Sequence, residues 1–162
     1  MSWNEMKKAK EEGGGLYLKL KDGEAVEGVF VGEPYCYFAK FGDKTEYDKW
    51  SEGLSFRFKI NFVTRGDNGE PVAKIFQQGS SFRDQLLDAI AEYGQDCIYK
   101  IKRTGSGKDD TRYAILFKAK LPPEQAEKIK SVRLNAFKKT VPGRDVEPGE
   151  HEPREPGDEA PW

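Results

Sequence analysis

The nine residues SFRFKINFV, at positions 55–63, constrain the fold of this chain more than any other stretch. Large apolar side chains occupy every second position from Phe56 to Phe62, and Arg57, Lys59 and Asn61 lie between them. Successive side chains of a β-strand point to opposite faces, so this alternation predicts a strand with one apolar face and one basic, polar face. Any fold of the chain must bury the first face against a core.

Two alternating stretches near the N-terminus predict a hairpin. LYLKL (16–20) and EAVEGVFV (24–31) flank Lys21-Asp22-Gly23, and Asp-Gly between alternating runs is typical of a tight turn. Gly28 inside the second run indicates a bulge or a bend. YCYF (35–38), which follows Gly32 and Pro34, predicts a further short strand.

The second half of the chain mixes helix and strand signals. Ser80 or Ser81 is expected to cap a helix that runs to Tyr93, with apolar residues at helical spacing and Gly94 as its end. The stretches 97–103 and 111–117 predict a last hairpin. Pro122-Pro123 then begins an amphipathic helix, which we place within residues 121–139.

This order predicts a mainly β protein: a five-stranded barrel of the oligonucleotide-binding (OB) type over residues 16–120, with one helix between strands 3 and 4 and an amphipathic C-terminal helix. An SH3-like barrel would lack the internal helix. Residues 1–15 end in three glycines and are expected to form a flexible arm. Residues 140–162 are expected to be a disordered tail that ends in Trp162.

The charge of the chain is unevenly distributed. The formal net charge is −1, but residues 141–162 contain seven acids and two bases, a net charge of −5. Residues 1–140 contain the other 25 bases and 21 acids, a net charge of +4. A mildly basic body with an acidic tail is more informative about partners than the overall balance.

Several classes of protein are disfavoured by composition. The two cysteines, Cys36 and Cys97, lie far apart, and His151 is the only histidine, so a zinc site at short ligand spacing is not expected and no cofactor is implied. No apolar run has the length of a membrane span, and the N-terminus lacks the apolar centre of a secretory signal. We therefore expect a cytoplasmic protein without a metal or a membrane partner.

Gly105-Ser106-Gly107-Lys108 resembles the end of a loop that binds nucleotide phosphates. Such a loop needs a glycine at position 102, a Ser or Thr after the lysine and a helix that follows, whereas this chain has Lys102, Asp109 and a predicted strand. We therefore interpret the stretch as a cationic hairpin tip.

A magnesium-dependent nuclease is a further alternative, for which Asp109-Asp110 is the one adjacent carboxylate pair in the predicted barrel. We expect no enzymatic activity.

Aromatic residues interleaved with cations predict a groove for single-stranded nucleic acid, because bases stack on rings and cations follow the phosphates. The candidates for phosphate contacts are Arg57, Lys59, Lys74, Lys100, Lys102, Arg103, Lys108 and Arg112. The candidates for stacking are Tyr35, Tyr37, Trp50 and Tyr113.

With the strand order, the segment RTGSGKDDTRYAIL and the acidic tail tipped by an aromatic residue, the chain resembles the small phage and bacterial-type single-stranded DNA-binding proteins. The resemblance implies sequence-tolerant binding in DNA replication, recombination or repair, in the cytoplasm of a bacterium or of a phage-infected host. It also implies that the tail recruits replication and recombination proteins and competes with DNA, through Asp158, Glu159, Pro161 and Trp162.

Two questions stay open at this level. A protein-interaction adaptor, with the barrel as a scaffold and no nucleic-acid binding, is the alternative from another class. The helix within 121–139 packs either on its own barrel or on a second copy, so a homo-oligomer is also an open alternative.

Overall fold

The structure is a computed structural model that describes residues 3, 16–107, 110–137 and 140–142. Its strands and helices are, in chain order, β1 Ala25–Ala39, β2 Ser55–Arg65, β3 Pro71–Gly79, α2 Ser80–Tyr93, β4 Cys97–Thr104, β5 Arg112–Lys120 and α3 Pro123–Lys130. The predicted mainly β class, the number of strands in the sheet and the helix before the last two strands are confirmed.

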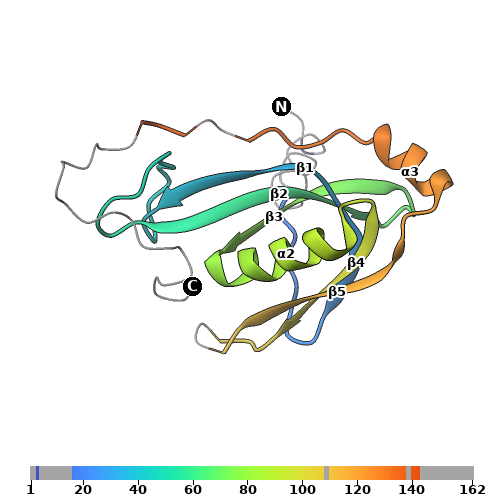
Figure 1. Cartoon of the computed structure of the whole chain (residues 1–162), viewed down its shortest axis with the longest axis horizontal. Coiled ribbons are helices and arrows are strands. Elements are labelled where there is room, and N and C mark those ends of the chain that lie inside the picture. The colour runs from blue at the N-terminus through green and yellow to red at the C-terminus, as the bar shows by residue number, and fades with distance from the viewer. Residues whose placement is uncertain (1–2, 4–15, 108–109, 138–139, 143–162) are drawn as a thin grey trace.

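The five strands form one antiparallel sheet in the order β3-β2-β1-β4-β5. β1 is the central strand: its first residues, Ala25 to Gly28, pair with β4, and most of its length pairs with β2. Figure 1 shows β1, β2 and β3 on one side of α2 and the β4–β5 hairpin on the other, so the sheet curls around the helix. The described edges β3 and β5 do not pair with each other, and the closed barrel that we predicted is not formed by these residues.

The core lies between the sheet and α2. Its largest fully buried side chains are aromatic and come from β1, β2, β3, β4 and α2, among them Phe30, Phe62, Phe76, Tyr99 and Phe82. The Phe30 ring is 4.8 Å from that of Phe62, and the Phe76 ring is 4.8 Å from that of Phe82. We call the side of the sheet that faces α2 the inner face and the opposite side the outer face.

β1 corrects one expectation, because the strands predicted at 24–31 and 35–38 are a single 15-residue strand. Gly32, Glu33 and Pro34 read as a turn in the sequence. They instead form an irregularity between two registers with β2, Val31 opposite Asn61 and Tyr35 opposite Lys59. Gly32 has a φ of +79°, which a residue with a side chain rarely adopts. The chain therefore bends here without leaving the sheet.

The hairpin expected from residues 16–31 is also wrong. The turn at Gly23 is present, but residues 16–20 run beside the edge strand β3 rather than along β1. The Leu18 amide donates to Ile75 O at 2.8 Å, and the Ile75 amide donates to Leu16 O at 2.6 Å. Leu20 is buried in the core, so the alternation of this segment reflects burial rather than a hairpin.

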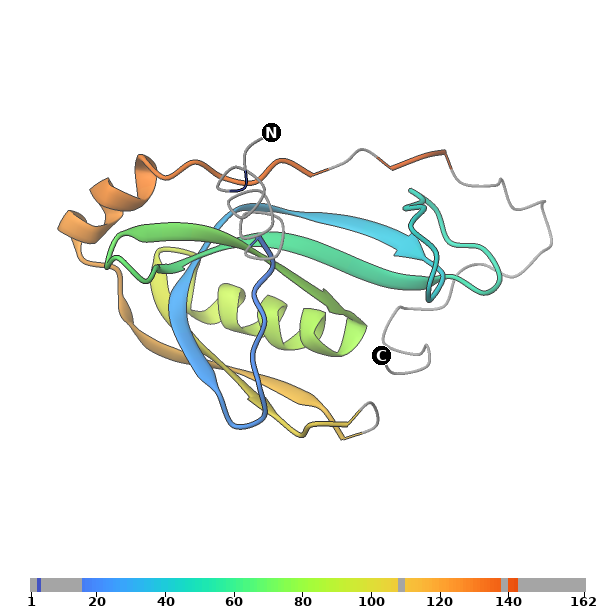
Figure 2. The same cartoon turned by 180° about the vertical axis from the view of Figure 1, so that it is seen from behind.

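The helix α2 and its end at Gly94 are confirmed, with a φ of +81° at Gly94 and the Gly94 amide donating to Ile90 O. The predicted serine cap is wrong, because the N-cap is Gly79 and no side chain caps the helix by a hydrogen bond. α3 is shorter than the predicted helix and ends at Lys130. The residues that follow run in extended form over β1, β2 and β3 on the outer face (Figures 1 and 2). We call residues 131–142 the strap and refer to its described residues, 131–137 and 140–142.

Candidate nucleic-acid interface

Four of the predicted site residues lie together on the outer face. In the register of β1 and β2, Tyr35 is opposite Lys59 and Tyr37 is opposite Arg57, so all four side chains leave the sheet on the same side. The two tyrosine rings stack, with centroids 5.3 Å apart and an interplanar angle of 25°. Lys59 Nζ lies 5.3 Å from the centroid of the Tyr37 ring, within the range of a cation–π contact. We call these residues the tyrosine–cation cluster.

Glu46, from the segment between β1 and β2, pairs with one of the two cations of this cluster. Its carboxylate accepts a hydrogen bond from Lys59 Nζ at 2.6 Å and another from the Tyr35 hydroxyl at 3.0 Å. Burial and the Glu46 carboxylate raise the pKa of Tyr35. Burial alone would lower the pKa of Lys59, but its hydrogen bond to Glu46 and the nearby tyrosines outweigh burial and raise it. Lys59 is therefore a charged lysine whose partner is already in place.

The sequence pattern predicted that this cluster would be open to solvent, but in the structure it is covered. Tyr37 is 1% exposed and Lys59 is 8% exposed, because residues from the N-terminal side and the strap lie over this part of the outer face. The Phe137 ring stacks on Tyr35 at 5.8 Å and 20°. A cavity of about 400 Å³ remains between Tyr37, Lys59, Gln77 and Phe137. This hollow is where an incoming group would first meet the cluster.

A second group of predicted residues lies on the outer face of the β4–β5 hairpin. Lys102 is opposite Ala114 and Thr104 is opposite Arg112, which places Lys102 and Arg112 on the same side as Lys100. Lys102 and Arg112 are exposed, and Arg112 donates a hydrogen bond to its neighbour Thr111 O at 2.9 Å. These three cations form the hairpin group.

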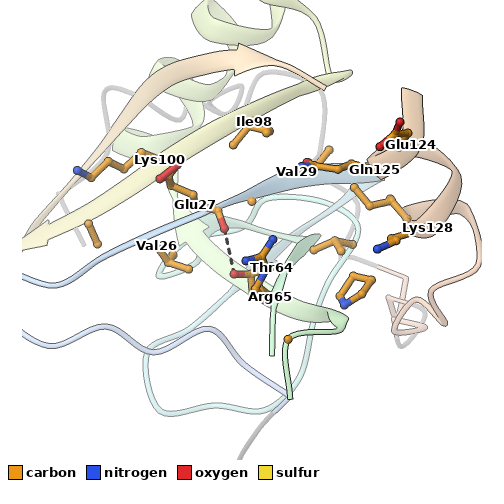
Figure 3. Close-up of a pocket in the computed structure, with 16 residues that line it drawn as sticks. Val26, Glu27, Val29, Thr64, Arg65, Ile98, Lys100, Glu124, Gln125 and Lys128 are labelled. Carbon is orange, nitrogen blue, oxygen red and sulfur yellow. Dashed lines mark hydrogen bonds between the residues drawn. The ribbon is translucent and has the colours of Figure 1, made fainter. Parts of the chain in front are cut away.

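Lys100 also lines a second cavity, of about 860 Å³, between the outer face and α3 (Figure 3). Its floor is formed by β1, β2 and β4, where Thr64 donates to Glu27 O at 3.0 Å. Arg65 and Lys128 add cations to its wall, and Glu27 and Glu124 add carboxylates. The lining therefore has both signs of charge beside apolar residues such as Val29 and Ile98.

The remaining predicted residues do not join these two groups. Lys74 is opposite Phe62 and Arg103 is opposite Tyr113, so these three residues belong to the inner face. Arg103 donates to Leu20 O, and Tyr113 packs on the core.

Trp50 is half-buried in the segment between β1 and β2. Lys108 and the tail residues Asp158, Glu159, Pro161 and Trp162 lie outside the described residues.

The tyrosine–cation cluster and the hairpin group are well separated. Thr64 lies seven positions along β2 from Arg57 and pairs with β1 at Gly28, where β1 also pairs with β4. At about 3.3 Å per residue this is roughly 23 Å. The outer face therefore presents a track with two cationic ends rather than one compact groove.

Three residues of this face were missed by sequence reasoning. Glu46 lies in a polar loop with no pattern of its own, Asn135 and Phe137 read as part of a helix, and nothing local marks their contacts with β1 and β2.

Within the described residues, no three His, Cys, Asp or Glu side chains gather as metal ligands. In the same part of the chain, neither helix combines the length and the apolar sequence that a membrane crossing needs. No known protein family, curated protein or solved structure matches this chain.

Proposed function

We propose that this protein binds single-stranded DNA along the outer face of its sheet, without sequence preference and without enzymatic activity. The observation that carries the proposal is the stacked pair Tyr35–Tyr37 beside Lys59 and Arg57 on a sheet face. Ring faces beside cations on a β-sheet suit unpaired bases, because every base offers a π face to a ring. Replication, recombination or repair is the cellular setting that we propose.

The strand order supports an OB-type architecture. An OB fold is a five-stranded, partly open Greek-key barrel. Here β1 pairs with both β2 and β4, and α2 lies between β3 and β4. Residues 16–20 pair with β3 and provide Leu18 and Leu20 to the core near the gap between the sheet edges. We propose that the sheet is an OB barrel whose last closure is made by this segment.

The proposed binding mode divides the work between the two groups. Bases stack at the tyrosine–cation cluster, where each stack contributes about 1–3 kcal/mol. Phosphates contact Lys100, Lys102 and Arg112 of the hairpin group. Sites of about 4–16 nucleotides are usual for one OB fold, so a strand of ordinary site length reaches both groups.

A fluorescence titration tests the proposed function. The full chain is titrated with a labelled thymidine oligonucleotide and with a duplex of the same length, at about 20 mM and about 200 mM salt. We expect binding of the oligonucleotide and weaker binding of the duplex. Affinity should fall markedly at the higher salt, because releasing counterions into a more concentrated salt solution is less favourable. Equal affinity for both, or no binding at low salt, contradicts the proposal.

One observation favours the adaptor as a second candidate. Tyr93 and Phe117 stack at 4.2 Å and 13° on the α2 side of the molecule, and Leu87, which also belongs to α2, is 60% exposed. Exposed apolar groups of this kind suit a protein partner. The acidic tail is proposed to recruit replication and recombination proteins in either case. An adaptor would bind no oligonucleotide at low salt and would lose its partner when Leu87 is changed to a charged residue.

A further inference from the structure

We propose that the face of Tyr35 now covered by Phe137 is a nucleobase-binding position, and that the strap is a cover which DNA displaces. The inference rests on the proposed function and deepens it, because it assigns a single base to a single ring. It also predicts that the described conformation is the closed form of the outer face.

Three rings form a continuous stack on the outer face. Tyr37 and Tyr35 are 5.3 Å apart at 25°, and Tyr35 and Phe137 are 5.8 Å apart at 20°. Tyr37 and Tyr35 belong to the sheet, whereas Phe137 comes from the extended strap. Phe137 thus occupies the end of a stack that begins on the sheet, which is the position that an incoming base would take. Offset parallel stacking is equally available to a phenyl ring and to a base.

The strap has polar contacts on each side of Phe137, one with the sheet and one with the segment between β1 and β2. The Asn135 amide donates to Asn61 Oδ1 at 2.9 Å, and Asn61 Nδ2 donates back to Asn135 O at 3.1 Å. At the other point, the Val141 amide donates to Glu46 O at 2.8 Å and the Asp48 amide donates to Val141 O at 3.1 Å. Water replaces bonds of this kind at a small net cost, so the strap is a cover that a ligand can displace.

Little apolar surface holds the strap in place. Leu134 is 39% exposed, Val141 is 42% exposed, and none of its described residues is buried. α3, from which the strap continues, also contains no buried residue. The stack of Phe137 on Tyr35 is an apolar contact that holds the strap, and losing it should shift the strap toward the open form.

The strap also fixes the partner of Lys59. Val141 is hydrogen-bonded to the backbone of Glu46, whose carboxylate accepts a hydrogen bond from Lys59 Nζ. Displacing the strap would therefore free the segment that neutralises Lys59 at the same time as it uncovers Tyr35. A ring face and a lysine for a phosphate would become available together.

The charge of the strap separates this mechanism from competition by the acidic tail. Residues 131–142 contain three bases, Arg133, Lys138 and Lys139, and no acid. A basic segment does not imitate the phosphates of DNA, so the strap would compete through the ring of Phe137. Its closure should accordingly depend little on salt, whereas competition by the tail should weaken as salt rises.

Binding of a thymidine oligonucleotide to strap variants tests the inference. Phe137→Ala is expected to tighten binding about three- to tenfold, the range for one aromatic stack. Leu134→Ala, an exposed apolar residue of the same segment, is the matched control and should leave affinity unchanged. Thermal unfolding without DNA confirms that each variant is folded at the titration temperature.

A double-mutant cycle makes the test specific to the ring pair. Tyr35→Ala removes a stack from both the bound DNA and the closed strap, so in the wild-type background its effect on affinity should be small. In the Phe137→Ala background the strap no longer competes, and Tyr35→Ala should weaken binding several-fold. Equal effects of Tyr35→Ala in the two backgrounds would overturn the inference.

The outcomes separate this inference from the proposed function. Weaker binding by Phe137→Ala would make Phe137 part of the DNA site and overturn the cover, while DNA binding itself would stand. Unchanged binding would also overturn the cover alone. Absence of binding by the wild type and by all variants would overturn both proposals. Binding by Phe137→Ala but not by the wild type would support both.

Amide hydrogen exchange provides a second readout without substitutions. The amides of Asp48, Asn135 and Val141 are hydrogen-bonded through the strap contacts. Oligonucleotide binding should speed their exchange if the strap is displaced. Slower exchange at all three amides would show that DNA binds with the strap in place.

Discussion

Lys59 and Glu46 form a largely buried ion pair on the outer face, with Nζ 2.6 Å from the carboxylate, although the two residues are thirteen positions apart in the sequence. This relationship defines the state of the proposed site. A basic residue at the right position of a strand is not by itself available to a phosphate, because a carboxylate from the preceding loop already satisfies it.

The pair predicts the effect of Glu46→Gln. The neutral amide keeps the size of the side chain but no longer neutralises Lys59 or repels phosphates, so affinity for a thymidine oligonucleotide should rise a few-fold. Stability should fall by about 1–2 kcal/mol because the hydrogen bond to the buried ammonium becomes weaker. Urea unfolding and a binding titration measure the two effects. Glu52→Gln, in the same loop and exposed, is the charge-matched control; an equal gain in affinity there would show that only net charge matters.

The two faces of the sheet predict different roles for two lysines that the sequence treated alike. Lys102→Gln should reduce the slope of log K against log salt by about 0.7, the contribution of one phosphate contact to a single strand. Lys74→Gln should leave the slope unchanged, because Lys74 belongs to the inner face. Titrations at four or more salt concentrations measure both slopes. If Lys74→Gln changed the slope more than Lys102→Gln, the DNA would bind the inner face, which would contradict our account.

The close packing around Gly28 predicts that a side chain at this position would destabilise the protein. A Cβ at this position would lie 2.5 Å from Val63 O and 2.6 Å from Phe62 Cε2, both of which are fixed in β2. Gly28→Ala should therefore destabilise the protein by about 2–3 kcal/mol through overpacking. In Gly66→Ala the closest atom is 3.2 Å away, so that variant should cost less than about 1 kcal/mol. Similar unfolding midpoints for the two variants would contradict the close approach of β1 and β2.

Tyr99 predicts a loss of stability at alkaline pH. Burial raises the pKa of Tyr99 from 10.0 to about 12, and its hydroxyl donates to Gly94 O. The unfolded chain loses this proton first, so the contribution is fully present below pH 10 and is lost as the pH rises toward 12.

The measurement for this prediction is the difference between the wild type and Tyr99→Phe. Near neutral pH the variant should be less stable by about 1 kcal/mol because its hydrogen bonds are missing. Between pH 10 and 12 the difference should shrink as the wild-type phenol ionises. A difference that stays constant across this range would show that the hydroxyl titrates alike in both states.

The local sequence pattern was sufficient to predict the elements whose structure is determined by their own residues. The alternation of residues 55–63 gave β2 its inner face, and α2 begins and ends where the serines and Gly94 indicated. The β4–β5 hairpin was also visible, because two alternating strands flank a glycine-rich tip.

The remaining features depend on contacts between distant segments. Gly32 to Pro34 look like a turn, yet strand pairing continues on both sides because β2 accepts both registers. Asn61 looks like a solvent-facing residue, but it bonds Asn135, 74 residues away, and is 5% exposed. A polar sheet face is predicted to be exposed to solvent unless the sequence shows which segment covers it. No local pattern in the strap indicates that it covers the outer face. The same reason explains why Lys59 and Tyr37 were expected to be open.

The central claim is that bases bind to the outer face of the sheet, and photochemical cross-linking tests it most directly. The full chain is irradiated with a thymidine oligonucleotide, digested, and the attached peptides are identified by mass spectrometry. We predict attachment at Tyr35 or Tyr37, at increased yield in Phe137→Ala, and in the peptides of the β4–β5 hairpin that carry Lys102 and Arg112. Attachment confined to Tyr93 and its neighbours on the α2 side would contradict the account.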